Sequence, residues 1–422
     1  METIHITKSQ LREFLIYYQG LSTQDRFKEK SGIKTYFERV GCVQYDPLNV
    51  VGRNADLTLQ SRIDGYSQEM LTELLYEDRL LIDGWDKMMS IYNIEDWINM
   101  GRVRTSMVES VKRTLKNRKA LDALKYLDQV KAELAEIGPA RSTQIDIGQT
   151  PKGSWGHGKL SSVAMDYMFH NGELGIKNKI SAHKVYDLIE NLIPNDILNQ
   201  PELFQTDEEF YAWYVKRRIG SIGIYWDRNG GGWLGQFVSK KAVRTKAFNN
   251  LLENEEIVQI KVEGFKENFF IRTDDVDMLT DFLDCYNTPQ LSSEDHEKDA
   301  CKKEVRFIAP LDNLMWDRKF IQDVFDFEYV WEVYKPVIQR KYGYYVLPVL
   351  YGNQFIARFE PEHIKGGSEL IIKDWWWEEQ VDVTDEMIKA VIDAFEKFKD
   401  YLNADKISEN IYELLRWEHP LI

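Results

Sequence analysis

Helical stretches followed by pairs of short strands recur three times in the first 283 residues, and this order restricts the fold more than any other feature. The predicted helices cover residues 8–20, 33–40, 67–76, 120–136, 160–170, 208–222 and 240–252. The predicted strand pairs cover residues 80–82 and 88–92, 173–180 and 184–188, and 257–262 and 269–272. Helices that precede a small hairpin are typical of winged-helix domains, so we predict three such domains in tandem.

The last part of the chain has a different pattern. Residues 342–350, 354–359 and 370–376 are apolar or alternating, as strands are, and a helix is predicted over residues 385–402. We predict a predominantly helical α+β fold with tandem winged-helix domains and a strand-rich α/β C-terminal closing domain. The predicted boundaries are 1–120, 121–204 and 205–283 for the winged helices, 284–303 for a linker, and 304–422 for the closing domain.

Composition restricts where the protein acts. The formal net charge is −15, yet the first 272 residues carry as many Lys and Arg as Asp and Glu, so the acidic excess lies behind them. A local basic face in the first part is therefore compatible with binding phosphates. The three cysteines are too few for a disulfide framework. With no signal pattern and no apolar run of membrane-spanning length, we expect a cytoplasmic protein without membrane contact.

Familiar catalytic and cofactor motifs are missing from the sequence. It contains no H-E-x-x-H, no paired C-x-x-C, no P-loop and no dinucleotide fingerprint, and its seven histidines are dispersed. Gly230-Gly231-Gly232 lacks the lysine and the strand-to-helix context of a phosphate cradle. We therefore expect neither a metal site nor a cofactor.

Gln44 and Asp46 are the candidate catalytic pair, because they lie two residues apart in an otherwise apolar run. In extended backbone, residues i and i+2 point to the same side, so the amide and the carboxylate can face one cleft. This pair suits hydrolysis of an N-glycosidic bond: the anion stabilises an oxocarbenium-like sugar, and the amide orients a water or the sugar.

Spacing alone favours a plainer explanation of this pair. Asp46 precedes Pro47, which is a common way to begin a helix, with Asp as the N-cap and Pro in the first helical position. That helix would carry Leu48 and Val51 inward, and Gln44 would lie on the surface.

Eight residues are candidates for DNA contact. They are Arg53, Asn54 and Arg62 after the pair, Lys240, Lys241 and Arg244 on the helix at 240–252, and Arg340 and Lys341 beside a run of tyrosines. The alternatives are a solvated basic face on that helix and tyrosines that pack the closing domain.

Five separated motifs, in this order, resemble a known family. They are VQYDPLNVVGR at residues 43–53, SR at 61–62, YMFHNGEL at 167–174, APLDNLMWDR at 309–318 and RKYGYYVLP at 340–348. The chain in this respect resembles the winged-helix DNA glycosylases of the YcaQ/AlkZ type, bacterial enzymes that excise N-alkylated purines and unhook interstrand crosslinks.

The resemblance implies a monofunctional, metal-independent glycosylase with Gln44 and Asp46 as its active-site pair. We expect it to act on double-stranded DNA as a monomer. It places the chain in the repair group, whose members carry Gln-x-Asp. Two departures stand out: Asn54-Ala55 where many members have a histidine, and Trp85-Asp86-Lys87-Met88 where many have Trp-x-His-Glu, so that Lys87 is expected to replace a phosphate contact. A non-catalytic winged-helix regulator and an adaptor with an acidic C-terminal half remain the alternative functions.

Overall fold

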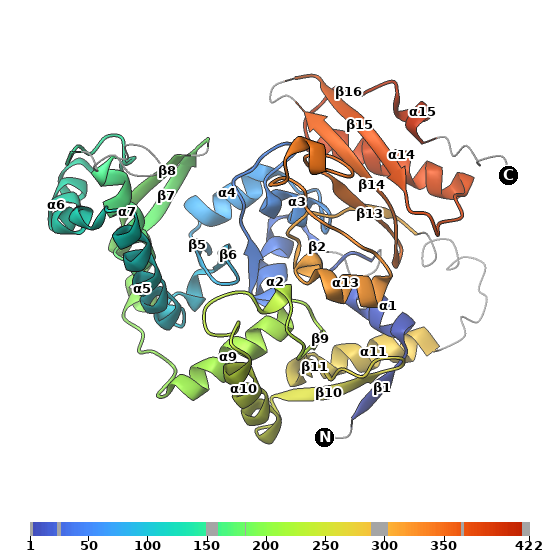
Figure 1. Ribbon diagram of the computed structural model, residues 1–422, viewed down its shortest axis with the longest axis horizontal. Coiled ribbons are helices and arrows are strands. Elements are labelled where there is room, and N and C mark those ends of the chain that lie inside the picture. Colours follow the sequence, from blue (N-terminus) through green and yellow to red (C-terminus); the bar gives the residue numbers. More distant parts are fainter. Residues whose placement is uncertain are drawn as a thin grey trace.

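The computed structural model describes residues 3–22, 27–148, 159–181, 183–287, 303–363 and 367–415. It is a mixed α+β structure, which confirms the predicted fold class. Figure 1 shows helices α5 to α7 with one hairpin at one end of the molecule and the C-terminal sheet at the other, with the N-terminal residues between them. Within the described ranges, no helix combines the length and apolar character needed to cross a bilayer.

The N-terminal unit is built from helices around a small antiparallel sheet in the order β3-β6-β5. Its elements are β1 (Ile4–Ile6), α1 (Lys8–Tyr18), β2 (Phe27–Lys28), α2 (Glu29–Val40), β3 (Cys42–Gln44), α3 (Asn54–Gln60), β4 (Ile63–Asp64), α4 (Gln68–Tyr76), β5 (Leu81–Trp85) and β6 (Met89–Asn93). A capping box between Thr7 and Gln10 begins α1. Its buried face contains Leu11, Phe14 and Leu15, as the helical spacing predicts.

The second unit consists of helices followed by one hairpin. Its elements are α5 (Gly101–Asn117), α6 (Leu127–Ile137), α7 (Leu160–Asn171), β7 (Leu174–Ile180), β8 (His183–Leu188) and α8 (Asn195–Leu198). Helix α7 ends at Gly172, whose φ of +88° closes the helix in the left-handed conformation that glycine adopts easily. The hairpin β7–β8 follows directly and reaches toward the first unit.

The third unit shares its sheet with the start of the chain. It contains α9 (Asp207–Gly220), β9 (Tyr225–Trp226), α10 (Lys241–Glu253), β10 (Ile257–Val262), β11 (Phe269–Arg272) and α11 (Val276–Asn287). The sheet order is β1-β10-β11-β9, and β1 pairs with β10 in parallel. The first strand thus lies outside the sheet of the N-terminal unit. The division into domains stays a prediction, and most of the expected linker, residues 288–302, is outside the described ranges.

The C-terminal unit is a five-stranded sheet with a long helix packed on it. Its elements are β12 (Val305–Phe307), α13 (Arg318–Phe325), β13 (Leu347–Tyr351), β14 (Gln354–His363), β15 (Glu369–Trp377), α14 (Asp385–Tyr401), β16 (Lys406–Ile407) and α15 (Ile411–Leu414). The strands follow the order β12-β13-β14-β15-β16. Phe395 of α14 packs against Phe307 and Phe359 of the sheet. Val51 and Leu57 of the first unit complete the same core.

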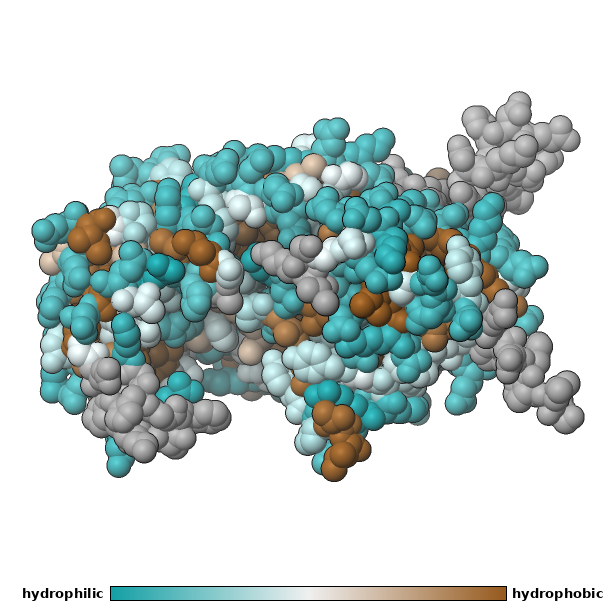
Figure 2. Space-filling view, turned by 90° about the horizontal axis from the view of Figure 1, so that it is seen from above, coloured by the Kyte–Doolittle hydropathy of each residue, from teal (hydrophilic) through white to brown (hydrophobic). Residues whose placement is uncertain are grey.

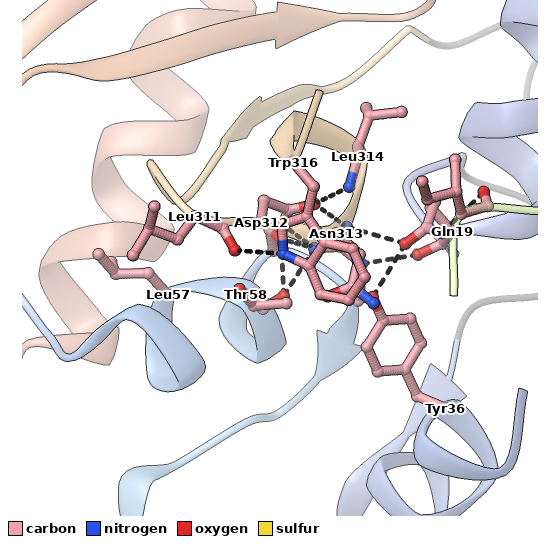
Figure 3. Close-up of polar contacts among 12 residues, drawn as sticks. Gln19, Tyr36, Leu57, Thr58, Leu311, Asp312, Asn313, Leu314 and Trp316 are labelled. Carbon is pink, nitrogen blue, oxygen red and sulfur yellow. Dashed lines mark hydrogen bonds and ion pairs between the residues drawn. The ribbon is translucent and has the colours of Figure 1, made fainter. Parts of the chain in front are cut away.

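A buried ion pair joins the first unit to the segment before α13. Arg62 and Asp312 are both fully buried, and two guanidinium nitrogens of Arg62 donate to the two carboxylate oxygens at 2.8 and 2.7 Å. Figure 3 shows Asp312 and Asn313 lying between Thr58 and Gln19. Arg62 also donates to the carbonyl oxygens of those two residues. The pair therefore ties three segments of the chain to one point.

We expect Asp312→Ala to lower the free energy of unfolding by about 3–5 kcal/mol, because it leaves an unpaired guanidinium in the interior. Urea titration measures this change. The matched control is Glu109→Ala, which breaks an exposed pair with Lys112 and is expected to cost less than about 0.5 kcal/mol. Equal effects of the two substitutions would show that the buried pair does not hold the units together.

Candidate active site and nucleic-acid interface

Strand β3 lies at the edge of the first sheet and places Gln44 at its end, with Asp46 two residues beyond. Gln44, its last residue, pairs with Ser90 of β6, and the Tyr45 N–H donates to the Met89 carbonyl at 2.8 Å. The turn between α2 and β3 uses Gly41, whose φ is +77°; a Cβ added at this position would lie 3.1 Å from the Arg217 guanidinium. A residue with a side chain at this position would strain the backbone and crowd that arginine.

The segment after Gln44 differs from the prediction. The expected helix from Asp46-Pro47 is wrong: residues 45–53 form no helix or strand, and α3 begins at Asn54 with Arg53 as its N-cap residue. The physical reason lies in two side-chain turns. Asp46 Oδ1 accepts from the Leu48 N–H at 2.9 Å, and Asn49 Oδ1 accepts from the Gly52 N–H at 3.0 Å. Such bonds compete with helical ones.

Asp46 is consequently not a helix cap. One carboxylate oxygen closes the turn, and among the residues that the structure describes no hydrogen bond to Oδ2 is formed. The side chain is only partly buried, so this oxygen is available to a ligand. The plainer explanation for an aspartate at this position, that it caps a helix, is excluded.

Gln44 lies in the interior and not on the surface. It is 9% exposed, and its Oε1 has no hydrogen-bond partner within the described part of the chain. A buried polar atom without a hydrogen-bond partner lowers the stability of the fold, so such an atom is often kept for a functional reason. Gln44 lies two residues before Asp46, and its unbonded Oε1 is suited to accept a hydrogen bond from a water or a substrate.

Two asparagines hold the backbone of β3 on its outer edge. Asn54 Nδ2 donates to the Gln44 carbonyl at 2.8 Å, and Asn313 Nδ2 donates to the Cys42 carbonyl at 2.9 Å. Asn54 Oδ1 in turn accepts from the Leu311 N–H at 2.9 Å. Asn54 was expected at the DNA, yet it is 2% exposed. Its position is that of a residue that positions Gln44.

The hairpin of the second unit contacts the candidate site. Lys179 of β7 forms a buried ion pair with Asp83 at 2.5 Å, and its Nζ lies 3.6 Å from the centre of the Tyr45 ring. Burial lowers the pKa of Lys179, against the opposing effect of the Asp83 charge. Arg53 donates to the Ser181 carbonyl at 3.4 Å at the hairpin turn. The hairpin thus fixes both Tyr45, between the catalytic candidates, and Arg53.

The charge of Asp46 acts on three tyrosines, and a second carboxyl group, Asp56, acts on two of them. Burial, together with the charges of Asp83, Asp56 and Asp46, raises the pKa of Tyr45 to about 12. Burial and the Asp46 charge also raise the pKa values of Tyr334 and Tyr345. Asp56 accepts a hydrogen bond from the Tyr66 hydroxyl at 2.7 Å, and burial raises its pKa. Asp46 is the carboxylate of this group with the greater exposure.

The structure separates the expected DNA contacts into two groups. Lys240, Lys241 and Lys341 are exposed, and Arg53 and Arg340 are partly exposed. Arg62 and Arg244 have almost no exposed surface. A side chain without exposed donors cannot contact a phosphate, so these two are not among the residues we propose for DNA binding.

Arg244 shows why the helical pattern was misleading. It lies outside the apolar stripe of α10, but residues 230–233 fold over it and bring Trp233 to 5.3 Å from its guanidinium. Its Nη1 donates to the Val238 carbonyl at 2.7 Å. The covering segment comes from a loop, so the periodicity of the helix could not reveal the burial.

Lys87 is not a phosphate contact either. It is 4% exposed, and its Nζ lies 5.3 Å from the centre of the Trp316 ring. Burial, and after it the positive charge of Arg218, lowers its pKa to about 7. Asp312, Asn313 and Trp316 were not identified as site residues, although the motif at residues 309–318 contains all three. Their distance in sequence from Gln44 gave no other sign of their role.

Comparisons with known proteins identify the family and the fold of the chain. A family model described as "DNA glycosylase AlkZ-like" matches residues 37–417. The solved structure of a Streptomyces sahachiroi DNA glycosylase, AlkZ, is similar with a TM-score of 0.62 at 14% sequence identity, over 96% of this chain and 99% of that one. At this identity the similarity of structure establishes the fold. The described residues bring together no group of three or more His, Cys, Asp or Glu side chains suited to a metal.

We expect Lys87→Met to raise the free energy of unfolding, and more at pH 6 than at pH 9. The pKa of Lys87 is about 7 in the folded protein against an ordinary 10.5, so between these values the unfolded chain binds the extra proton. The cost of burying Lys87 is therefore complete below pH 7 and falls as the pH rises. The stability gain should shrink by about 2.7 kcal/mol over this range.

Urea titrations at the two pH values measure this difference. The control is Lys116→Met on the exposed side of α5, for which the same change in stability is expected at both. If Lys87→Met also shows no dependence on pH, the amine is not held in an apolar environment.

Proposed function

The chain belongs to the AlkZ-like DNA glycosylase family, and from this premise we propose that it hydrolyses the N-glycosidic bond of N-alkylated purines in duplex DNA. Asp46 stabilises the oxocarbenium-like sugar, and Gln44 positions the water or the sugar. The observation that carries this proposal is the pair of unused acceptors, the buried Gln44 Oε1 and the second oxygen of Asp46.

The chemistry needs no strong general acid, because an N7-alkylated guanine already carries a positive charge. The bond from C1′ to N9 breaks, and the base leaves as a neutral molecule. Water forms the new bond to C1′ while its hydrogens donate to Gln44 Oε1 and to the Asp46 carboxylate. The carboxylate accepts the proton that the water loses and releases it to solvent, so the product is an abasic site in an intact strand.

The same leaving group occurs in interstrand crosslinks made by nitrogen mustards, where an alkyl chain joins the N7 atoms of two guanines. Excision of one of these bases unhooks the crosslink, and we include this reaction in the proposal. Both candidate residues come from one chain, so one copy suffices for one lesion. The regulator in which Asp46 only caps a helix has lost its supporting observation, because no helix begins there.

We propose that Lys240, Lys241 and Lys341 bind DNA phosphates, with Arg53 and Arg340 nearer the site. The exposure of the three lysines and the partial exposure of the two arginines support the assignment. Phosphate contacts of this kind give affinity that falls as the salt concentration rises.

We expect Asp46→Asn to reduce excision of N7-methylguanine from a duplex by about 10²–10³-fold, because it removes the charge that stabilises the sugar. The melting temperature should stay nearly unchanged, since asparagine Oδ1 can accept the same bond from Leu48. Cleavage of the abasic product with alkali, followed by gel electrophoresis, measures the rate.

The matched control is Asp146→Asn. Asp146 Oδ1 accepts from the Gly148 N–H at 3.1 Å in a turn of the same type, in the second unit. It should keep wild-type excision. Full activity of Asp46→Asn would remove the catalytic assignment, and an inactive wild-type protein on this duplex and on a mustard crosslink would refute the proposed function.

Gln44→Met is expected to lower excision by about 10²-fold or more while leaving the free energy of unfolding unchanged or raised, because the side chain it replaces has an unpaired buried oxygen. Gln60→Met should behave in the opposite way. Gln60 Nε2 donates to the Phe307 carbonyl at 3.2 Å, so this control loses stability and keeps activity. A loss of stability in both variants would indicate that Gln44 has only a structural role.

A further inference from the structure

The loop between α13 and β13 carries three strongly exposed hydrophobic side chains. Ile338 is 94% exposed, Tyr334 83% and Val337 73%, the three largest values among the large hydrophobic side chains that the structure describes. Figure 2 shows one hydrophobic projection standing clear of a hydrophilic surface. Exposed aliphatic side chains at the tip of a projection are costly in water, so their presence calls for a partner.

The base of this loop is held firmly. The Glu332 carboxylate, 4% exposed, accepts from the backbone N–H groups of Lys341 and Tyr342 at 2.9 Å each and from Lys335 Nζ at 2.8 Å. Arg340 Nε donates to the Lys335 carbonyl at 3.0 Å, which closes the loop a second time. The tip therefore projects from a rigid support and not from a loose segment.

The loop lies beside the candidate active site. Trp331 contacts Tyr334 at 5.7 Å and Tyr345 at 6.2 Å between ring centres. Tyr345 belongs to the hydrophobic core against which Trp331 packs, and Leu48 and Val50, which follow Asp46 in the chain, pack against the same core. After burial, the charge of Asp46 raises the pKa of Tyr334. Arg340 and the exposed Lys341 follow the tip along the chain and supply positive charge next to it.

We propose that the Val337-Ile338 tip is a wedge that inserts between base pairs of duplex DNA beside the lesion, with Tyr334 at its edge. This inference rests on the proposed function and specifies how the duplex is opened. Apolar wedges that enter a base stack are a known means of separating neighbouring bases, and the cost of unstacking is a few kcal/mol per step. Apolar surface that enters the space vacated by the extruded nucleotide offsets that cost.

The observations favour DNA over a protein partner as the occupant. Arg340 and Lys341 follow the tip, and among the described residues no wider apolar face surrounds it. Positive charge next to an apolar tip is suited to DNA, in which phosphates flank the stacked bases. The two aliphatic side chains form a narrow point, of the size that fits between stacked bases and too small for a stable protein interface.

The test compares Val337→Ser/Ile338→Ser with the wild-type protein. On duplex containing N7-methylguanine we expect kcat/KM to fall at least about 10-fold, a cost of roughly 1.4 kcal/mol in the transition state. On the same strand without its complement, where no stack with a partner strand needs opening, we expect less than a 2-fold change. Ile338→Leu should retain activity, and Leu203→Ser, which removes an exposed leucine from another loop, should behave as wild type.

A second measurement reports the wedge without requiring excision. In the Asp46→Asn background, binding to duplex with 2-aminopurine next to the lesion should raise its fluorescence, and the double serine substitution should abolish this rise. If the wild-type protein excises nothing yet the loop-dependent rise persists, the proposed function fails while the wedge stands.

Three outcomes would overturn the wedge. They are normal excision with an unchanged fluorescence rise in the double variant, an equal loss on duplex and single strand, and a change from dimer to monomer in size-exclusion chromatography with excision retained. The last would identify the tip as a contact between two copies of the chain. Melting curves of each variant show that the fold is intact.

Discussion

The ion pair between Arg62 and Asp312 is the constraint on which the rest of the site depends. Both groups are fully buried, and isolating either one in an apolar interior would cost several kcal/mol. The cost is offset only because the donors are used: Arg62 bonds to both Asp312 oxygens and to the backbone of Gln19 and Thr58, while Asp312 Oδ1 also accepts from the Leu314 N–H. Any relative movement of these segments would break several bonds together.

Strand β3 is held in place by the residues on either side of Asp312. The residues on either side of Asp312 extend the constraint, since Leu311 is bonded to Asn54 and Asn313 to the Cys42 carbonyl. Because β3 is an edge strand, its outer carbonyl groups need partners other than a neighbouring strand. Asparagine side chains supply them. Gln44 at the end of a strand that is bonded along both edges, with Asp46 two residues beyond it, is held in position more precisely than a residue on a free loop.

Regular elements were predicted well because their patterns are local. The strands of the third unit's hairpin were found at the predicted residues, and helix α7 ends at the Asn171-Gly172 stop. The failures have long-range or side-chain causes. Asp46 and Asn49 bond to nearby backbone and form turns in place of the expected helix, a competition that the Asp-Pro pattern does not resolve. Arg62 pairs with a residue 250 positions away, and Arg244 is covered by a segment outside its own helix, so the helical pattern does not distinguish either from a solvated arginine.

The burial of three of the eight expected DNA contacts changes how affinity has to arise. At most five cationic candidates remain, and each phosphate contact contributes a slope of about −0.9 in the dependence of log affinity on log salt. The whole chain carries a net charge of −15, so long-range attraction adds little. A protein with few phosphate contacts that must still separate stacked bases needs a contribution that salt does not screen. Burial of apolar surface is such a contribution, and the exposed Val337 and Ile338 side chains can supply it.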